Sequence, residues 1–350
     1  MSVILVDVGG THIRFSIYLN GEMSEVVQWR ISEFDDFSSA VRQFLSDKKD
    51  TFSGMIIGAA GIRTANCIQL TNYTWLIDAE KIKSDFQLQF VTLVNDFSLQ
   101  GLGLLVCKEA YHKHLGAYIK PQQGTCAVVG SGTGLGVCFL IQNDDGSFQV
   151  VESEAGHTTI SGVTPALSAI AHKAFEKLPH ISFERFVSGP GVLFLYQIIG
   201  ENYAQWQETV LFDEVVAMKQ AYQFNHTLDE TFVPVNNPLD ITRLAEQGNE
   251  IALITWWLFF QYLGVFCSNM ALAFKTTGGV YLVGSIFTHP FVRKLLEQSA
   301  IRKIFETKGR FKKFMQSIPL ILVTKDRIQF DGLAYLAQKK NLLKKHYFSV

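Results

Sequence analysis

The chain has 350 residues, of which 48% are apolar and 18% charged, a composition that excludes disordered and collagen-like proteins. Its 31 Lys and Arg residues nearly balance 32 Asp and Glu residues, so the basic excess typical of duplex-binding proteins is missing and no nucleic-acid partner is expected. Five scattered cysteines without C-x-x-C spacing, and a start that does not resemble a secretory signal, predict a reduced, cytoplasmic protein without disulfides or zinc.

Two blocks of alternating strand and helix patterns follow one another along the chain. In the first block, strands are predicted at Val3–Val8, Ile13–Leu19, Glu25–Arg30, Met55–Ala60 and Phe90–Val94, and helices at Phe34–Leu45 and Asp96–Val106. In the second block, which begins near Thr125, strands are predicted at Cys126–Val129, Val137–Ile141, Val280–Val283 and Leu320–Val323, and helices at Pro165–Phe175, Val192–Ile199, Glu208–Gln223, Asn249–Lys275 and Gly332–Lys345. Each block opens with a strand, a glycine turn and a second strand. This internal echo predicts two related α/β domains.

The stretch Gly200–Asn249 is the least regular part of the second block. It contains Pro234, Asn236, Asn237 and Pro238, residue types that interrupt helix and strand patterns. We therefore expect a surface excursion there.

One apolar segment is long enough to cross a bilayer. Ile251–Phe274 has 24 residues without a formal charge. It is the only such run, it contains Thr255, Gln261, Ser268 and Asn269, and it lies between amphipathic segments. These features favour the buried helix of a large domain over a membrane span, so no membrane partner is expected.

The first glycine turn reads Asp7-Val8-Gly9-Gly10-Thr11. A strand leads into it, the glycines permit unusual backbone conformations, and bare amides can approach an anion closely. Thr11 adds a hydroxyl donor, and Asp7 at the strand end is suited to orient a magnesium ion through a water molecule. A plain hairpin turn explains the same residues equally well, so this motif alone is a moderate signal.

The second glycine turn, Gly130-Ser131-Gly132-Thr133-Gly134-Leu135-Gly136, places four glycines in seven residues. It is not a Walker A loop, because no Lys-Ser or Lys-Thr follows at the required spacing, and Leu135 stands where a dinucleotide fingerprint requires glycine. The flanking strands predict a hairpin whose tip is all backbone. Two such tips facing each other would bind a triphosphate through amide donors without a P-loop lysine.

Several segments, taken in order, resemble motifs of the bacterial-type glucokinase family, which shares the actin and Hsp70 fold. The resemblance is carried by Asp7–Thr11 with Arg14, Leu70–Trp75, Val94–Phe97, Gly130–Gly136, Glu154–His157, Glu184–Gly191, Gly278–Gly284 and Lys308–Lys312. The matches extend from about residue 3 to residue 338, nearly the whole chain. The related repressor–kinase group usually carries a cysteine-rich zinc motif, which this sequence lacks.

The resemblance implies an α/β protein with the two-domain actin-like ATPase (ribonuclease H-like) fold and a cleft between the domains. The small domain would comprise residues 1–102 and 330–350, and the large domain residues 103–329. The resemblance also implies a homodimer. The implied reaction uses ATP, with Mg²⁺, to phosphorylate D-glucose at O6, giving glucose 6-phosphate and ADP.

The resemblance assigns a role to each motif residue. Asp96 would be the general base that accepts the proton of the sugar hydroxyl, in a reaction that depends mainly on positioning and charge stabilisation. Hydrogen bonds to glucose would come from Asn72, Asn95, Asp96, Glu154, His157 and Glu184. The ATP site would be formed by Asp7, Gly9, Gly10, Thr11, Gly130, Ser131, Gly132, Thr133, Gly134 and Gly284. Without the resemblance, Asn95 or Asp96 is also typical of a helix N-cap, a role compatible with catalysis.

The sequence departs from the family pattern at several points. Ala155 replaces the second residue of Glu-Gly-Gly-His, and Thr158 follows where an acidic residue is usual. Ser285 replaces a glycine of the adenosine motif, which is a reason to expect weaker ATP binding or an altered choice of nucleotide. Arg327–Gly332 replaces the usual Asn-Pro-Gly-Leu-Leu-Gly, and Gly200–Asn249 is longer than usual.

Two other functions fit the same residues. A kinase for mannose, fructose or an amino sugar would keep the fold and change only the substrate. A sugar-sensing regulator would bind sugar without phosphorylating it. The retention of Asp96, both glycine turns and the expected sugar contacts favours the enzyme.

Overall fold

The computed structural model describes residues 2–70, 73–224 and 227–339. The described residues form two compact units, which are treated separately below. Those within Met1–Glu109, Gln149–Glu152 and Lys325–Val350 make up the first unit, and those within Ala110–Phe148 and Ser153–Thr324 make up the second. The domain boundaries expected from the sequence stay a prediction.

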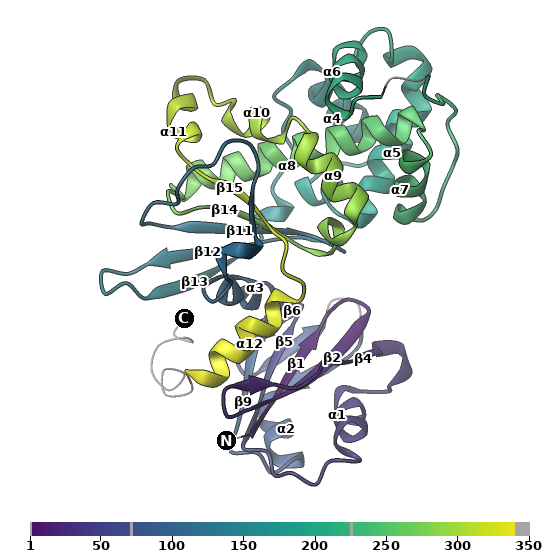
Figure 1. The fold of residues 1–350 in the computed structure, drawn as a ribbon. Helices are drawn as coiled ribbons and strands as arrows, with labels where there is room; N and C mark the ends of the chain where they lie inside the picture. The colour runs from purple at the N-terminus through teal and green to yellow at the C-terminus, as the bar shows by residue number, and fades with distance from the viewer. Residues whose placement is uncertain (1, 71–72, 225–226, 340–350) are drawn as a thin grey trace. The chain divides into compact units, whose positions relative to one another are not determined.

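A six-stranded sheet forms the centre of the first unit (Figure 1). Its strands are, in spatial order, β3 (Glu22–Met23), β2 (His12–Leu19), β1 (Ser2–Val8), β5 (Gly54–Ala59) and β9 (Phe90–Asn95), with β4 (Val27–Arg30) also paired to β2. β1 runs antiparallel to β2 and parallel to β5, and β5 runs parallel to β9. Because β1 and β5 are central strands packed on both faces, their residues are buried almost throughout.

Helices cover both faces of this sheet. Each face has its own hydrophobic core. The helices α1 (Phe37–Leu45) and α2 (Ala79–Asp85) contribute to one core, and α3 (Asp96–Leu104) and α12 (Ile328–Gln338) contribute to the other. Neighbouring residues of β1 alternate between the two cores, with Val6 in the first and Leu5 in the second, as the pleat of a strand requires. The unit also contains η1 (Ile31–Glu33) and an antiparallel sheet of β6 (Gly61–Thr64), β7 (Cys67–Leu70) and β8 (Leu76–Asp78).

The helices α3 and α12 pack closely through glycines (Figure 1). A Cβ on Gly103 of α3 would lie 2.1 Å from the carbonyl oxygen of Ile328, and a Cβ on Gly332 of α12 would lie 2.1 Å from that of Leu99. Larger side chains would therefore push the two backbones apart. This contact fixes the helix that begins with Asp96.

The second six-stranded sheet has the order β10 (His112–His114), β15 (Leu320–Val323), β14 (Gly279–Val283), β11 (Cys126–Ser131), β12 (Leu135–Gln142) and β13 (Phe148–Ser153). β11 runs antiparallel to β12 and parallel to β14, which in turn runs parallel to β15. The pairing of β11 with β12 and β14 therefore repeats the pairing of β1 with β2 and β5. The predicted echo of strand, glycine turn and strand is confirmed.

Helices make up most of the rest of the second unit (Figure 1). The α-helices are α4 (Pro165–Phe175), α5 (Gly189–Trp206), α6 (Phe212–Tyr222), α7 (Pro238–Glu246), α8 (Glu250–Ala273), α9 (Pro290–Gln298), α10 (Ile301–Glu306) and α11 (Lys312–Gln316). The 3-10 helices are η3 (Ala155–His157), η4 (Phe183–Arg185), η5 (Ser285–Thr288) and η6 (Gly309–Phe311), and η2 (Glu109–Tyr111) precedes β10.

The apolar segment at Ile251–Phe274 forms α8, the central helix of the second unit. By length and composition it is able to span a membrane, but its most apolar window is completely buried inside the protein. A Cβ on Gly264 would lie 2.9 Å from the carbonyl oxygen of Ile301, so α10 packs directly on its backbone. The prediction of a buried core helix is confirmed.

The prediction of an irregular surface excursion at Gly200–Asn249 holds for only part of the stretch. The described residues between Gln223 and Asn237, which include Pro234 and Asn236, form no helix or strand, and most of them are exposed. The end of α5 and the whole of α6 and α7 lie in this stretch. The Asn237 side chain accepts a hydrogen bond from the amide of Leu239, and Pro238 occupies the first turn of α7. The Asn-Pro pair therefore starts a helix, because an N-cap acceptor followed by proline suits a helix N-terminus.

Candidate active site

The first glycine turn is the tip of the β1–β2 hairpin. Val8 pairs with Ile13, and the amide of Gly9 donates to the carbonyl oxygen of His12 at 3.0 Å. We call Gly9–His12 the first tip. A Cβ on Gly9 would lie 3.7 Å from its nearest atoms, Nη1 of Arg14 and the carbonyl oxygen of His12, so a methyl group would fit there in ordinary van der Waals contact.

Asp7, just before the first tip, is a buried carboxylate with two partners. Its Oδ2 accepts hydrogen bonds from Nη1 of Arg14 at 2.9 Å and from Nε2 of Gln329 at 3.1 Å. Arg14 in turn donates from Nε to Oε1 of Gln28 at 2.7 Å. Asp7 is only 4% exposed, and a buried charge requires such partners. Gln329 belongs to the segment that departs from the family pattern, and that departure was the only signal for it in the sequence.

Asp96 lies at the same sheet edge as the first tip. Val8 of β1 is in register with Ala59 of β5, and Ala59 with Asn95 of β9, all in parallel strands. The carboxyl ends of the three strands therefore coincide, and β9 lies about 10 Å from β1 across the sheet. Asp96 follows β9 directly as the first residue of α3 and is half-buried.

Asn95 is the N-cap of α3. Its Oδ1 accepts hydrogen bonds from the amides of Phe97 at 2.8 Å and Ser98 at 3.2 Å. The capping interpretation is thus correct for Asn95, and its acceptor oxygen is committed to the helix. What Asn95 can offer a sugar is the Nδ2 donor.

Asn72, another expected sugar ligand, lies outside the described residues. The strands on either side of it, β7 and β8, form a hairpin, and the amide of Leu70 donates to the carbonyl oxygen of Trp75 at 3.1 Å. Trp75 is buried in the core beneath the sheet.

The second glycine turn is the tip of the β11–β12 hairpin, as predicted. Ser131 pairs with Leu135, and we call Gly132–Gly134 the second tip. The amide of Gly132 donates to the carbonyl oxygen of Gly134 at 2.9 Å, and the carbonyl oxygen of Gly132 accepts from the amide of Gly189 at 2.7 Å. The second tip is therefore hydrogen-bonded to the N-terminus of α5.

The segment that follows β14, which begins with Gly284, packs against the base of the second tip. Gly284 has φ +114°, and a Cβ on it would lie 2.2 Å from the carbonyl oxygen of Ser131. Only glycine fits there without strain. The Oγ of Ser285 points toward Gly132, where a Cβ would lie 3.1 Å from it. Ser285 thus places a hydroxyl beside the second tip. Its effect on nucleotide binding stays a prediction.

Three expected sugar ligands form one cluster in the second unit. Nε2 of His157 lies 3.9 Å from Oε2 of Glu154, and its Nδ1 lies 3.7 Å from Oε1 of Glu184. The Glu154 side chain is 88% exposed and that of Glu184 is 30% exposed, so the cluster opens to solvent. Such a group presents several acceptors to a ligand rich in hydroxyl groups.

Glu184 also touches the β11–β12 hairpin, a contact that sequence reasoning missed. Its Oε2 accepts a hydrogen bond from the amide of Leu135 at 2.9 Å. The two residues are 49 positions apart, and nothing in the local pattern of either motif indicates their pairing.

A magnesium ion would depend on Asp7. Among the residues that the structure describes, no three His, Cys, Asp or Glu side chains converge as a metal site. Asp7 offers a single carboxylate, one oxygen of which already accepts from Arg14 and Gln329. This donor set fits an ion held mainly by nucleotide phosphates and water, and does not fit an all-protein site.

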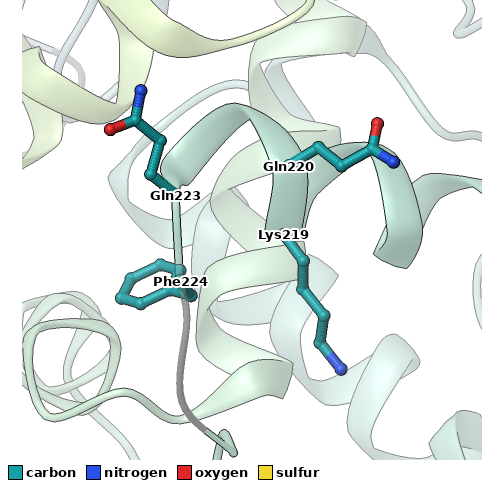
Figure 2. Close-up of a pocket in the computed structure, with 4 residues that line it drawn as sticks. All are labelled: Lys219, Gln220, Gln223 and Phe224. Carbon is teal, nitrogen blue, oxygen red and sulfur yellow. The ribbon is translucent and has the colours of Figure 1, made fainter.

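A pocket of about 440 Å³ lies at the end of α6, away from the residues expected to bind ligands. It is lined by Lys219, Gln220, Gln223 and Phe224. These four side chains point in different directions and do not converge on one point (Figure 2). The pocket therefore lacks the converging polar groups of a ligand site.

The two sheets and their glycine hairpins define the class of the protein, the two-domain actin-like ATPase fold of sugar kinases. Among solved structures, a glucokinase from an Antarctic psychrotroph has a TM-score of 0.77 at 23% identity, covering 96% of this chain and 98% of the other. A ROK family glucokinase from Streptomyces griseus, in complex with glucose and AMPPNP, has a TM-score of 0.58 at 18% identity, covering 97% and 100%.

Sequence comparison narrows the class to one family. The glucokinase family model matches residues 4–340. A glucokinase from Helicobacter pylori (strain J99) is 30% identical over 334 residues, covering 94% of this chain and 93% of the relative. The chain therefore belongs to the glucokinase family. It spans about half the length of some curated relatives that it matches, such as a bifunctional glk protein of Burkholderia thailandensis, of which it covers 48% at 29% identity.

Proposed function

We propose that this chain is an ATP-dependent glucokinase that phosphorylates D-glucose at O6, with Asp96 as the general base. Membership of the glucokinase family supports phosphorylation of a sugar. ATP as the phosphoryl donor is supported by the AMPPNP bound to the Streptomyces griseus enzyme of the same fold.

The observation that carries the proposal is the shared sheet edge of Asp96 and the first tip. The strands β1, β5 and β9 end in register, and the open α/β sheets of many proteins bind ligands beyond this carboxyl edge. A separation of about 10 Å between β1 and β9 leaves room for a phosphoryl group at the first tip and a sugar hydroxyl at Asp96.

In the reaction, the Asp96 carboxylate accepts the O6 proton while O6 bonds to the γ-phosphorus. The bond from that phosphorus to the bridging oxygen breaks, and ADP leaves with the electron pair. Backbone amides of the tips stabilise the phosphate oxygens. A magnesium ion, when bound, would neutralise charge on the phosphates, with Asp7 orienting one of its waters.

The proposed sugar ligands are side chains that carry hydrogen-bond donors and acceptors. Asn95 offers its Nδ2 donor, and Glu154, His157 and Glu184 offer acceptors and a further donor. When a bound sugar covers these groups, a sugar that lacks a matching hydroxyl leaves one of them unpaired and is discriminated against.

The test is a coupled assay of ADP release with Mg-ATP and a panel of hexoses, run on the wild type and on Asp96→Asn. Loss of a positioned base should lower kcat for glucose by about 10²- to 10⁴-fold. Glucose binding, measured by calorimetry, should remain. Asp78→Asn is the matched control, because Asp78 caps α2 and asparagine caps a helix equally well.

The outcomes separate the candidate functions. Turnover of a hexose other than glucose would overturn only the substrate. Glucose binding without turnover of any hexose would overturn the enzyme and favour a sugar-sensing regulator. An Asp96→Asn variant as active as the wild type would remove Asp96 from the base role.

We further propose that the enzyme is a homodimer, which rests on the family resemblance alone, and that it is cytoplasmic, which rests on its scattered cysteines. Light scattering after size exclusion should give twice the 39.3 kDa mass of one chain. A mass of 39.3 kDa would contradict the dimer.

A further inference from the structure

Leu135, the residue directly after the second tip, is held from two sides by the motifs assigned to sugar binding. On one side, its amide donates to Oε2 of Glu184 at 2.9 Å. On the other, its carbonyl oxygen lies where a Cβ on Gly156 would approach to 2.0 Å, so η3 packs directly on its backbone. The backbone next to the second tip therefore contacts both the segment that carries Glu184 and the segment that carries His157.

The turn that carries Glu184 is anchored in the core of the second unit. Phe183 and Phe186 are fully buried and pack on Phe266 and Tyr262 of α8, with ring centroids 5.2 and 4.9 Å apart. The carbonyl oxygen of Glu184 also accepts a hydrogen bond from Oγ of Ser188 at 2.8 Å. The backbone of Glu184 is therefore held in place, and a ligand acts on this residue through its side chain.

Gly134 shows how closely the carboxylate and the second tip fit. A Cβ on Gly134 would lie 2.7 Å from Oε2 of Glu184. Glycine at this position gives the carboxylate room to reach the Leu135 amide. Gly132, at the other end of the second tip, faces Ser285 instead.

We propose that Glu184 is a positioning residue for the second tip as well as a sugar ligand, so that sugar and nucleotide binding are coupled through its carboxylate. One oxygen faces His157 and the sugar cluster, and the other holds the Leu135 amide. The inference rests on the proposed function for the identity of the two ligands. A sugar that orders Glu184 also orders the second tip, and a nucleotide on the second tip orders Glu184 in return.

The first test is a change in the nucleotide hairpin that is read out on the sugar. Gly134→Ala should raise the Kd for glucose, measured by calorimetry without nucleotide, about fivefold. Gly132→Ala is the matched control, because it alters the same tip but points away from Glu184. It should leave the Kd for glucose within about twofold of the wild type.

The second test is a change in the sugar cluster that is read out on the nucleotide. Glu184→Asp keeps the charge but withdraws it by one methylene from the Leu135 amide. The Kd for Mg-AMPPNP without glucose should rise about fivefold. Glu184→Gln keeps the length and an acceptor oxygen, so it should retain Mg-AMPPNP affinity while weakening glucose. Glu154→Asp is the matched control, because Glu154 is assigned to the same cluster and extends into solvent.

In the wild type, glucose and Mg-AMPPNP should lower each other's Kd by the same factor, and in Glu184→Asp that factor should approach one. A merely structural role would change stability and leave this factor alone.

The proposal is overturned if Glu184→Asp binds Mg-AMPPNP like the wild type, or if Gly134→Ala binds glucose like the wild type. A wild type that binds both ligands without turnover would overturn the proposed function, while the crossed measurements would still decide the coupling. Binding of neither ligand would overturn both.

Discussion

The two glycine tips have similar sequences but different surroundings. At the first tip, the nearest atoms to a Cβ on Gly9 would be 3.7 Å away, and the support comes from the side chains of Arg14 and Gln329 on Asp7. At the second tip, the support is backbone, from Gly189 and Gly284, together with Glu184. A side chain would therefore fit at Gly9 of the first hairpin, whereas glycine at position 284 allows close packing of neighbouring chain on the second.

The largest expected effect tests this comparison by adding one methyl group at the first tip and one against the base of the second tip. Gly284→Ala should lower the free energy of unfolding by about 3 kcal/mol or more, because it combines a positive φ with a contact to backbone. Gly9→Ala should change it by less than about 1 kcal/mol. Urea unfolding followed by circular dichroism measures both. Equal losses would show that the two tips are packed alike.

The second prediction concerns the side-chain support of the first tip. Arg14→Met should cost about 2 kcal/mol, because it leaves the buried Asp7 charge with only Gln329 as partner. Part of the effect is reduced by the 23% exposure of Arg14. The double variant Asp7→Asn with Arg14→Met, measured by the same unfolding experiment, should recover part of the loss. A double variant less stable than Arg14→Met would contradict a role for Arg14 in neutralising Asp7.

A third prediction extends the comparison to the base of the second hairpin. Burial raises the pKa of the Cys126 thiol to about 12, from an ordinary 9.0. Between these values the unfolded chain releases the proton and the folded chain keeps it, so stability falls as pH rises. The loss attributable to this thiol should be about 1 kcal/mol by pH 10, and absent below pH 8. Urea unfolding of Cys126→Ala should show a shallower decline above pH 9, and parallel declines would count against the burial.

The smallest expected effect is at Ser285, whose hydroxyl would lie 3.1 Å from a Cβ on Gly132, whereas the nearest side chain to a Cβ on Gly9, that of Arg14, would be 3.7 Å away. If the hydroxyl crowds the nucleotide, Ser285→Gly should lower the KM for ATP about threefold with kcat unchanged. Steady-state kinetics with ATP and GTP measure this. A higher KM in the variant would instead identify Ser285 as a hydrogen-bond donor to the nucleotide.

Features that depend on short stretches of sequence were predictable. The hairpins with their glycine tips, the helix at Pro165–Phe175 and the capping role of Asn95 follow from local patterns of burial, turn residues and N-cap chemistry. The start of α7 was predictable in principle. Asn237 and Pro238 are a helix-start signal that was interpreted as an interruption.

Features that depend on pairing between distant residues were not predictable from one sequence. The bond between Glu184 and the Leu135 amide, and that between Gln329 and Asp7, join residues whose local patterns carry no trace of their partner. The short strands β6, β7 and β8 were also missed, because each has at most four residues and no clear alternation.

The contact between Asp7 and Gln329 also bears on how the protein is made. The two residues are 322 positions apart, and β1, which carries Asp7, leaves the ribosome long before α12. At about 5 to 20 residues per second, roughly 16 to 64 s pass between the synthesis of one and of the other. For that time the first strand has no α12 to pack on, and its carboxylate lacks one of its two partners. The nascent first unit therefore completes its core, and the support of its tip, only after the whole of the second unit, which ends at Thr324, has been translated.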